Sequence, residues 1–398
     1  AMGESQRAAH ERDIDLFGPD YSQDAPRVWD ELRGECPVAH TSSNGGVWIP
    51  TRYEDIAAVA YDTEAFSSRD VGVVQTPSNA TLLVAPPITS DPPFHTDSRR
   101  MLLPYFAPKA VERMESATRS IATSLLDAIE GDSTTNAADT YAKHIPVLVI
   151  ASMLGLPSED EDMFTQWAID ILQSGDTDFA TRTRATKEVL AYFTEITARR
   201  RNELSDDLVS DLIRTPLPNG DPLTDKHIAG TGFLLLLAGI DTTWSSIGAS
   251  ILHLATHPED RQRLVDEPEL IPTAVEEFLR AYSPVTMARV AAHDAEIGGC
   301  PVSAGDKVLL PFGAGNRDPE QFEQADEIVI DRAENRHFAF GIGIHRCLGS
   351  NLARMELRVA LEEWLLRFPN FELTAGESAQ WAGTQIRGPR QVPVTLQP

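Results

Sequence analysis

Apolar residues recur at steps of three and four along much of the chain, a period that predicts amphipathic helices. The pattern is clearest in four segments: residues 107–129, 160–173, 181–202 and 258–265. A longer segment, residues 224–255, is apolar along most of its length and predicts a buried central helix. Period-two alternation is weak and brief, and it predicts short strands at residues 46–50, 290–301 and 307–311. We therefore expect a mainly α fold with small β-sheets.

The segments between these elements show no internal repeat, low-complexity tract or long flexible linker. We therefore expect residues 1–398 to form a single domain. The chain carries 34 Lys and Arg against 60 Asp and Glu, a formal charge of −26. A nucleic-acid binder or a protein docked on an anionic membrane needs a basic face, so this charge argues against both classes.

The N-terminal residues lack the apolar stretch of a signal peptide, and the longest strongly apolar run, residues 233–240, is too short to span a bilayer. The cysteines, Cys36, Cys300 and Cys347, are odd in number and far apart. They do not form a disulfide framework, and they suit a reducing compartment. We expect a cytoplasmic protein.

One cysteine lies in an unusual segment, residues 338–349, which reads Phe-Ala-Phe-Gly-Ile-Gly-Ile-His-Arg-Cys-Leu-Gly. Its glycines allow a tight turn with positive φ, in which the backbone can approach a flat ligand closely. After Cys347, apolar residues at steps of four and three predict a helix, so the thiol lies where a turn enters a helix. Backbone N–H groups at a helix start stabilise a thiolate, and a thiolate in an apolar loop suits an axial bond to haem iron.

Other interpretations of this segment are weaker. A lone buried cysteine is usually a small hydrophobic residue. A zinc site from His337, His345 and Cys347 lacks a fourth ligand and paired-cysteine spacing. The Gly341-Ile342-Gly343 sequence lacks the third glycine of a dinucleotide-binding loop.

The whole string decides between these interpretations, because it resembles the haem-binding signature of the cytochromes P450. The matching positions are Phe340, Gly343, His345, Cys347 and Gly349. The resemblance implies a helical triangular prism with small sheets. It also implies haem b between the long central helix and the cysteine-loop helix, with Cys347 as the axial ligand of the iron.

The central helix contains Gly239-Ile240-Asp241-Thr242-Thr243. Glycine and threonine are unfavourable inside an apolar helix, and a helix interrupted in this way often marks a functional kink. The segment resembles the oxygen-activating stretch of the family. By that resemblance Gly239 makes room for dioxygen, Thr242 binds oxygen at the iron, and Asp241 supplies protons through water.

Three further matches occur in the order that the family predicts. Residues 91–100, Asp-Pro-Pro-Phe-His-Thr-Asp-Ser-Arg-Arg, resemble a segment whose histidine and arginine bind the haem propionates. The resemblance implies four propionate ligands: His95, Arg99, Arg289 and His345. It also implies a structural lock of three residues: Glu277, Arg280 and Arg332. The loop before Arg332 departs from the family pattern, because Ile328-Val329 stand where Phe-Asp is common.

By resemblance, the reaction is monooxygenation by dioxygen of a C–H bond, as hydroxylation or oxidative dealkylation. No flavin or iron–sulfur segment is visible, so two electrons must come from a separate ferredoxin or flavodoxin. A locally basic stretch is a candidate docking surface, in contrast to the negative chain as a whole. Its residues are Arg99, Arg100, Lys109, Arg113 and Arg346. We expect a monomer.

Candidate substrate contacts lie on the central helix and in two further segments, residues 71–85 and 285–287. They include Leu234, Leu235, Ala238, Val285 and Met287, and the segments contain no isolated Arg or Lys, so we expect a small, largely apolar, neutral substrate. Two other functions of the same site remain open: a peroxide-using peroxygenase and a non-catalytic haem-thiolate sensor. The Asp241-Thr242 pair argues against the first. A haem-free helical scaffold is a third alternative, which a colourless purified protein would support.

Overall fold

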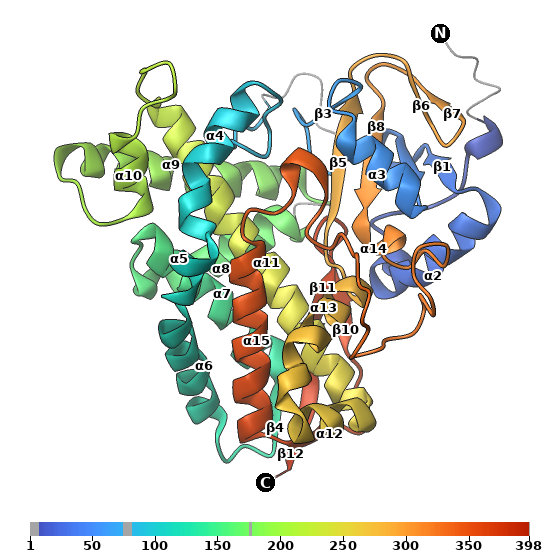
Figure 1. Ribbon diagram of the computed structural model, residues 1–398, viewed down its shortest axis with the longest axis vertical. Coiled ribbons are helices and arrows are strands. Elements are labelled where there is room, and N and C mark those ends of the chain that lie inside the picture. Colours follow the sequence, from blue (N-terminus) through green and yellow to red (C-terminus); the bar gives the residue numbers. More distant parts are fainter. Residues whose placement is uncertain (1–7, 75–81, 175–176, 398) are drawn as a thin grey trace.

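The computed structural model describes residues 8–74, 82–174 and 177–397, which form a large helical body beside a smaller part rich in β-structure (Figure 1). The longer helices are α2 (Pro19–Glu35), α3 (Tyr53–Tyr61), α4 (Phe94–Leu102), α6 (Glu115–Ile129), α7 (His144–Leu154), α8 (Glu161–Leu172), α9 (Phe179–Asn202), α11 (Asp225–Thr256), α12 (Pro258–Asp266), α13 (Ile271–Ala281) and α15 (Ser350–Arg367). The shorter ones are α5 (Pro108–Glu112), α10 (Leu208–Arg214) and α14 (Phe312–Gly315).

The strands are short and form small sheets. They are β1 (Val38–Thr41), β2 (Val47–Pro50), β3 (Phe66–Ser67), β4 (Thr134–Asn136), β5 (Thr286–Ala291), β6 (Ala295–Ile297), β7 (Cys300–Val302), β8 (Lys307–Pro311), β9 (Asn370–Leu373), β10 (Gln380–Ala382), β11 (Gly388–Gln391) and β12 (Pro393–Gln397). The largest sheet has the order β1-β2-β8-β5-β3, and only β2 and β8 pair in parallel within it. The mainly α fold with small sheets expected from the sequence is confirmed.

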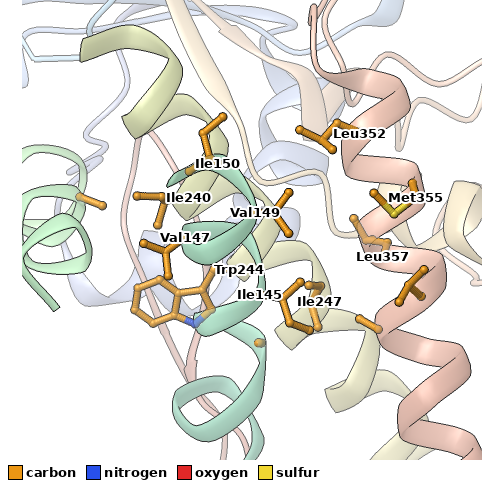
Figure 2. Packing of buried hydrophobic residues seen from close by; sticks show 14 of the residues in the cluster. Ile145, Val147, Val149, Ile150, Ile240, Trp244, Ile247, Leu352, Met355 and Leu357 are labelled. Carbon is orange, nitrogen blue, oxygen red and sulfur yellow. The ribbon is translucent and has the colours of Figure 1, made fainter. Parts of the chain in front are cut away.

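The central helix α11 organises the helical body. It packs against α7 on one side and α15 on another, and Figure 2 shows their apolar side chains meeting, with Ile145 and Val149 on α7, Ile247 on α11 and Leu357 on α15. Thr224 caps the start of this helix, because its hydroxyl accepts a hydrogen bond from the N–H of His227 at 3.2 Å. A second hydrophobic cluster lies in the β-rich part, between the large sheet and helices α2 and α3.

Helix α11 is long and apolar enough to cross a membrane by length and composition alone. However, 78% of its most apolar window is buried inside the protein, as expected of a core helix. The helix is continuous from Asp225 to Thr256, so the interruption expected at Gly239–Thr243 does not break it. The Thr242 hydroxyl donates to the carbonyl oxygen of Ala238 at 2.9 Å, which accommodates the threonine without breaking the helix.

Two other sequence predictions need correction. The helix predicted over residues 107–129 is divided into α5 and α6 by a turn at Arg113 and Met114, where the Met114 N–H donates to the Val111 carbonyl oxygen. The apolar period continues through that turn, so periodicity alone does not reveal it. The strand predicted over residues 290–301 is the end of β5 followed by the β6–β7 hairpin. Of the predicted pocket segment 71–85, residues 75–81 lie outside the described part of the chain.

Candidate active site

A cavity of about 1000 Å³ lies between the helical body and the β-rich part. The cysteine loop forms one wall and α11 another, so Cys347, Gly239 and Thr242 all line it. All five predicted substrate contacts also line it: Leu234, Leu235, Ala238, Val285 and Met287. Residues that are far apart in the sequence therefore meet around one space.

The backbone of the cysteine loop holds the thiol toward this cavity. The N–H of Cys347 donates to the Phe340 carbonyl oxygen at 2.7 Å, and Gly341 and Gly343 have φ of +68° and +72°. Gly343 does not line the cavity; a Cβ there would lie 2.9 Å from the Ala60 carbonyl oxygen, so this glycine allows the loop to approach α3. Gly349 caps the start of α15, directly after the cysteine.

The Cys347 thiol is exposed only because it faces the cavity. Burial raises the pKa of this thiol, and the Gly349 N–H together with the charges of Arg99 and Arg346 only partly offsets that effect. The helix start therefore does not produce a free thiolate by itself. A bound cation would be needed to hold the deprotonated sulfur.

On the opposite wall, α11 turns a polar and small-residue face toward the cavity. Ala238 is exposed there, and Gly239 and Thr242 are half-buried, although most of the helix is buried. A Cβ on Gly239 would lie 3.0 Å from Ile150 on α7. The glycine thus allows α7 and α11 to pack closely, a structural reason that the sequence does not reveal.

Asp241 is fully buried beside this face. Its Oδ1 accepts hydrogen bonds from Arg390 at 2.9 Å and Gln173 at 3.0 Å, while Oδ2 has no partner among the described residues. Burial raises the pKa of Asp241, against the lowering effect of the Arg390 charge. The Arg390 side chain is 12% exposed, and its guanidinium lies over the Trp244 ring at 4.5 Å.

Basic and imidazole groups gather at another side of the cavity. Arg289 is buried, and burial lowers its pKa to about 10. It donates to the Ala288 carbonyl oxygen but has no ion-pair partner in the described part of the chain. Arg99 reaches across to donate to the Arg346 carbonyl oxygen at 2.6 Å.

Two histidines complete this group. The His345 and His95 rings lie 4.3 Å apart, and burial together with the charge of Arg289 lowers the pKa of His345 to about 2. Ser68 Oγ lies 2.9 Å from His345 Nε2. His95 does not line the cavity, but it lies behind His345, and its buried Nε2 has no partner among the described residues. An unpaired arginine and an unsatisfied imidazole nitrogen fit a cofactor that carries carboxylates.

The three predicted lock residues form a buried ion-pair network. Glu277 and Arg280 are fully buried and make two parallel contacts of 2.8 and 2.9 Å, and Arg332 reaches Glu277 at 3.0 Å. Burial would raise the pKa of Glu277, but its hydrogen bonds with Arg280 and the Val329 N–H lower it overall. The predicted contact of Arg332 is therefore present despite its unusual loop.

The zinc interpretation does not fit this geometry. His337 contacts Glu276 at 3.0 Å, and no group of three or more His, Cys, Asp or Glu side chains within the described ranges could hold a metal ion. The other two cysteines, Cys36 and Cys300, are buried in the β-rich part, away from the cavity lining.

Comparison with known proteins identifies the family to which this fold belongs. The family model for cytochrome P450 matches residues 44–379. The chain belongs to the cytochrome P450 family. This P450 is 36% identical to the mycinamicin IV hydroxylase/epoxidase of Micromonospora griseorubida, over 92% of this chain and 94% of that protein. It is 34% identical to the vitamin D(3) 25-hydroxylase of Pseudonocardia autotrophica, over 96% of each chain.

Solved structures agree. The crystal structure of CYP109E1 from Bacillus megaterium in complex with testosterone matches with a TM-score of 0.88 and 30% identity, over 96% of this chain and all of that one. The protein is therefore a haem b monooxygenase that acts with dioxygen, an organic substrate and a redox partner. The resemblance stated from the motifs is confirmed.

Several residues of the site, in the cavity wall or behind it, belong to no sequence motif. Arg390 and Gln173, the partners of Asp241, come from β11 and from the residue after α8. Glu356 on α15 lines the cavity with a fully buried carboxyl, and burial raises its pKa to about 8. Its Oε2 has no partner among the described residues. Since these side chains come from separate elements, only the folded chain brings them to the site.

Proposed function

We propose that Cys347 would bind the haem iron and that Arg99, Arg289, His345 and His95 would bind the haem carboxylates. The observation that carries this proposal is the position of the Cys347 thiol across one cavity from Ala238, Gly239 and Thr242, with Arg289, which has no ion-pair partner among the described residues, in the same lining. When bound, haem supplies the oxidising chemistry that inserts one atom of dioxygen into a C–H bond. The chain positions the reactants and controls protons.

Proton supply is the role of Asp241 and Thr242 in this proposal. Asp241 accepts a proton at Oδ2, which has no partner among the described residues. Arg390 and Gln173 bind the other oxygen, Oδ1, so they do not compete with the proton. The Thr242 hydroxyl lines the cavity and must release the Ala238 carbonyl oxygen before it can donate to a bound group. This acid–alcohol pair favours dioxygen over peroxide as the oxidant.

The electron donor is proposed to be a separate ferredoxin or flavodoxin that docks over the cysteine loop, so residues 1–398 act as a single haem domain. Arg100, Lys109, Arg113 and Arg346 are exposed, and Lys109 and Arg113 have no ion-pair partner within the described residues. In Figure 1, α4 and α5 lie beside the loop and the start of α15. The Asn351 side chain donates to the Phe106 carbonyl oxygen at 3.0 Å, which joins these two regions.

The exposed Leu103 adds an apolar contact to the same surface, with 47% of its surface accessible. A basic rim around an apolar residue suits an acidic protein partner. We also propose that the protein is cytoplasmic, because three free cysteines suit a reducing compartment. We propose that it acts as a monomer.

The substrate is proposed to have a largely apolar body. Aliphatic side chains, among them Leu234, Val285 and Met287, line the cavity, and a cavity of about 1000 Å³ has room for a substrate beside the cofactor. The relatives support this class, since their names include a vitamin D(3) hydroxylase and a complex with testosterone.

The test is the absorption spectrum of the reduced protein with carbon monoxide, together with turnover under ¹⁸O₂. We expect the shifted band of a thiolate-bound haem, and its loss in Cys347→Ala, because that variant lacks the proposed ligand. Cys36→Ala is the matched control and should keep the band, since its thiol lies outside the cavity. An unchanged band in Cys347→Ala would overturn the assignment, and the absence of labelled product from any panel substrate would favour the sensor alternative.

A further inference from the structure

Arg182 on α9 lines the cavity at a point that the sequence pattern does not connect to the site. The other α9 residues at this wall include the short or apolar Thr183, Thr186 and Leu190 and the exposed Lys187. The Arg182 side chain lies against the chain segment that follows β3, because a Cβ on Gly72 would be 3.2 Å from its Nη2. The guanidinium is therefore held near the cavity wall and is only half-buried.

A buried ion pair between Lys307 and Asp70 lies beside Arg182. Lys307 on β8 is buried, with 2% of its surface accessible, and its Nζ contacts Asp70 Oδ2 at 3.0 Å. Lys307 also donates to the carbonyl oxygens of Gly72 and Val74, both at 2.7 Å, so all three of its N–H groups are used. Burial lowers the pKa of Lys307, and the positive charge of Arg182 adds to this effect.

Each carboxylate oxygen of Asp70 already accepts one hydrogen bond. Its Oδ2 accepts from Lys307, and its Oδ1 accepts from the Gly72 N–H at 3.3 Å. No carboxylate within the described ranges lies within ion-pair distance of Arg182, and no acceptor there receives a hydrogen bond from its side chain. An arginine at a cavity wall with five free donors is prepared to bind an oxyanion, for which its planar fork is suited.

We propose that the substrate of this P450 carries a carboxylate on its apolar body and that Arg182 binds this carboxylate. The inference rests on the proposed function, and it replaces the neutral substrate expected from the sequence. A bound substrate carboxylate would add a second negative charge beside Asp70. Lys307 and Arg182 would then each have one carboxylate partner. Lys187 and Lys226 also line the cavity at exposed positions and would attract an acid toward it despite the net charge of −26.

Arg182 is distinct from the groups assigned to the haem. Arg99, Arg289 and His345 form the cluster assigned to the haem, and Arg69, which also lines the cavity, is exposed and directly follows Ser68, whose hydroxyl lies 2.9 Å from His345. Among the arginines that line the cavity in the described ranges, only Arg182 combines partial burial with a position beside the Lys307–Asp70 pair.

The experiment uses the haem-loaded enzyme and a series of ω-(imidazol-1-yl)alkanoic acids of increasing chain length, each paired with its methyl ester. The imidazole ties one end of every probe to the iron, so the absorbance shift reports binding without any requirement for turnover. At neutral pH we expect one or more acids to bind about tenfold or more tightly than the matching ester, as for a charge-assisted pair.

Arg182→Gln should reduce this preference to within about twofold while leaving ester binding unchanged, and Arg182→Lys should keep part of it. Arg199→Gln is the matched control, since Arg199 lies on the same helix, is exposed and does not line the cavity. It should keep the full preference.

Two results would overturn the inference: no chain length shows a preference for the acid, or the preference survives in Arg182→Gln. The reduced carbon monoxide spectrum, recorded on each variant, separates this failure from failure of the proposed function. A thiolate-haem band without acid preference rejects the carboxylate alone, whereas the absence of the band rejects the haem assignment.

Discussion

At the scale of single residues, Asp241 is the buried carboxyl group that we propose as a proton donor. The carboxylate is anchored at one oxygen by Arg390 and Gln173 and is unpaired at the other. Burial of the carboxylate and its pairing with Arg390 act on its pKa in opposite directions, so small changes around it can alter its protonation. The group is therefore suited to exchange a proton.

Asp241→Asn should lower the turnover rate by about a hundredfold, since general acid–base groups contribute on this order. The thiolate-haem spectrum should be unchanged, because Asn keeps the shape of the side chain and leaves Cys347 untouched. The measurement is product formed per unit time and per haem at saturating substrate and electron donor. Asp221→Asn, on an exposed loop, is the control and should have full activity; equal activity of the two variants would contradict the proton role.

Glu356 gives a prediction about pH. Burial raises its pKa from 4.5 to about 8. Between pH 4.5 and about 8, the carboxyl group therefore keeps its proton in the folded protein but loses it in the unfolded chain. Stability must therefore fall as the pH rises from 4.5 to about 8, by roughly 2–5 kcal/mol.

Glu356→Gln has no carboxyl group that can titrate at this position, so its stability should not show this part of the fall with rising pH. Thermal unfolding midpoints of the haem-loaded variant and wild type, compared across this range, should differ more at high pH than at low pH. Parallel curves for the two proteins would show that Glu356 is already ionised in the folded state.

At the scale of elements, the Glu277–Arg280–Arg332 network ties α13 to the long segment before the cysteine loop. Arg280 donates to the carbonyl oxygens of Asn316, Ala325 and Glu327, so one buried guanidinium holds several points of irregular backbone. This segment leads into the cysteine loop, and its fixed path therefore contributes to the position of Cys347.

Glu277→Gln should lower the free energy of unfolding by about 3–5 kcal/mol, because it leaves two buried guanidinium groups without their carboxylate. We expect a lower haem content as well, measured by the ratio of haem to protein absorbance. Arg263→Gln breaks an exposed pair with Asp331 and serves as the control, with little change in either quantity. Equal losses in both variants would contradict a special role for the network.

What the sequence could predict depends on how local each feature is. The cysteine loop and the Asp241–Thr242 pair occupy a few consecutive residues, so their chemistry could be recognised from sequence alone. Arg390 and Gln173 reach Asp241 from β11 and the end of α8, Arg182 reaches the cavity from α9, and no spacing rule joins these residues to the motifs. The turn between α5 and α6 was missed for the opposite reason, because it does not interrupt the apolar period.

At the scale of the whole molecule, a formal charge of −26 surrounds a locally basic surface near the cysteine loop. An acidic electron donor would be repelled by most faces and attracted by this one, so the charge distribution selects an orientation as well as a partner. This effect acts over distance and weakens with salt.

Charge reversal at Arg100 and Arg113 together should slow reduction by an acidic ferredoxin about tenfold or more at low ionic strength, and should weaken its salt dependence. Stopped-flow measurement of the first electron transfer would show this change. Arg263→Glu on α12 is the matched reversal outside the proposed surface and should leave the rate unchanged. Unaltered rates in the double variant would place the donor elsewhere.

The cavity also bears on how this protein is made in a cell. Residues of both hydrophobic clusters line it, so each cluster presents apolar surface to the cavity that bound haem would cover. The haem would in this sense be a component of the protein interior. A cell that makes the polypeptide faster than it makes haem should accumulate a loosened form that proteases degrade, and the yield of intact protein should follow the haem supply.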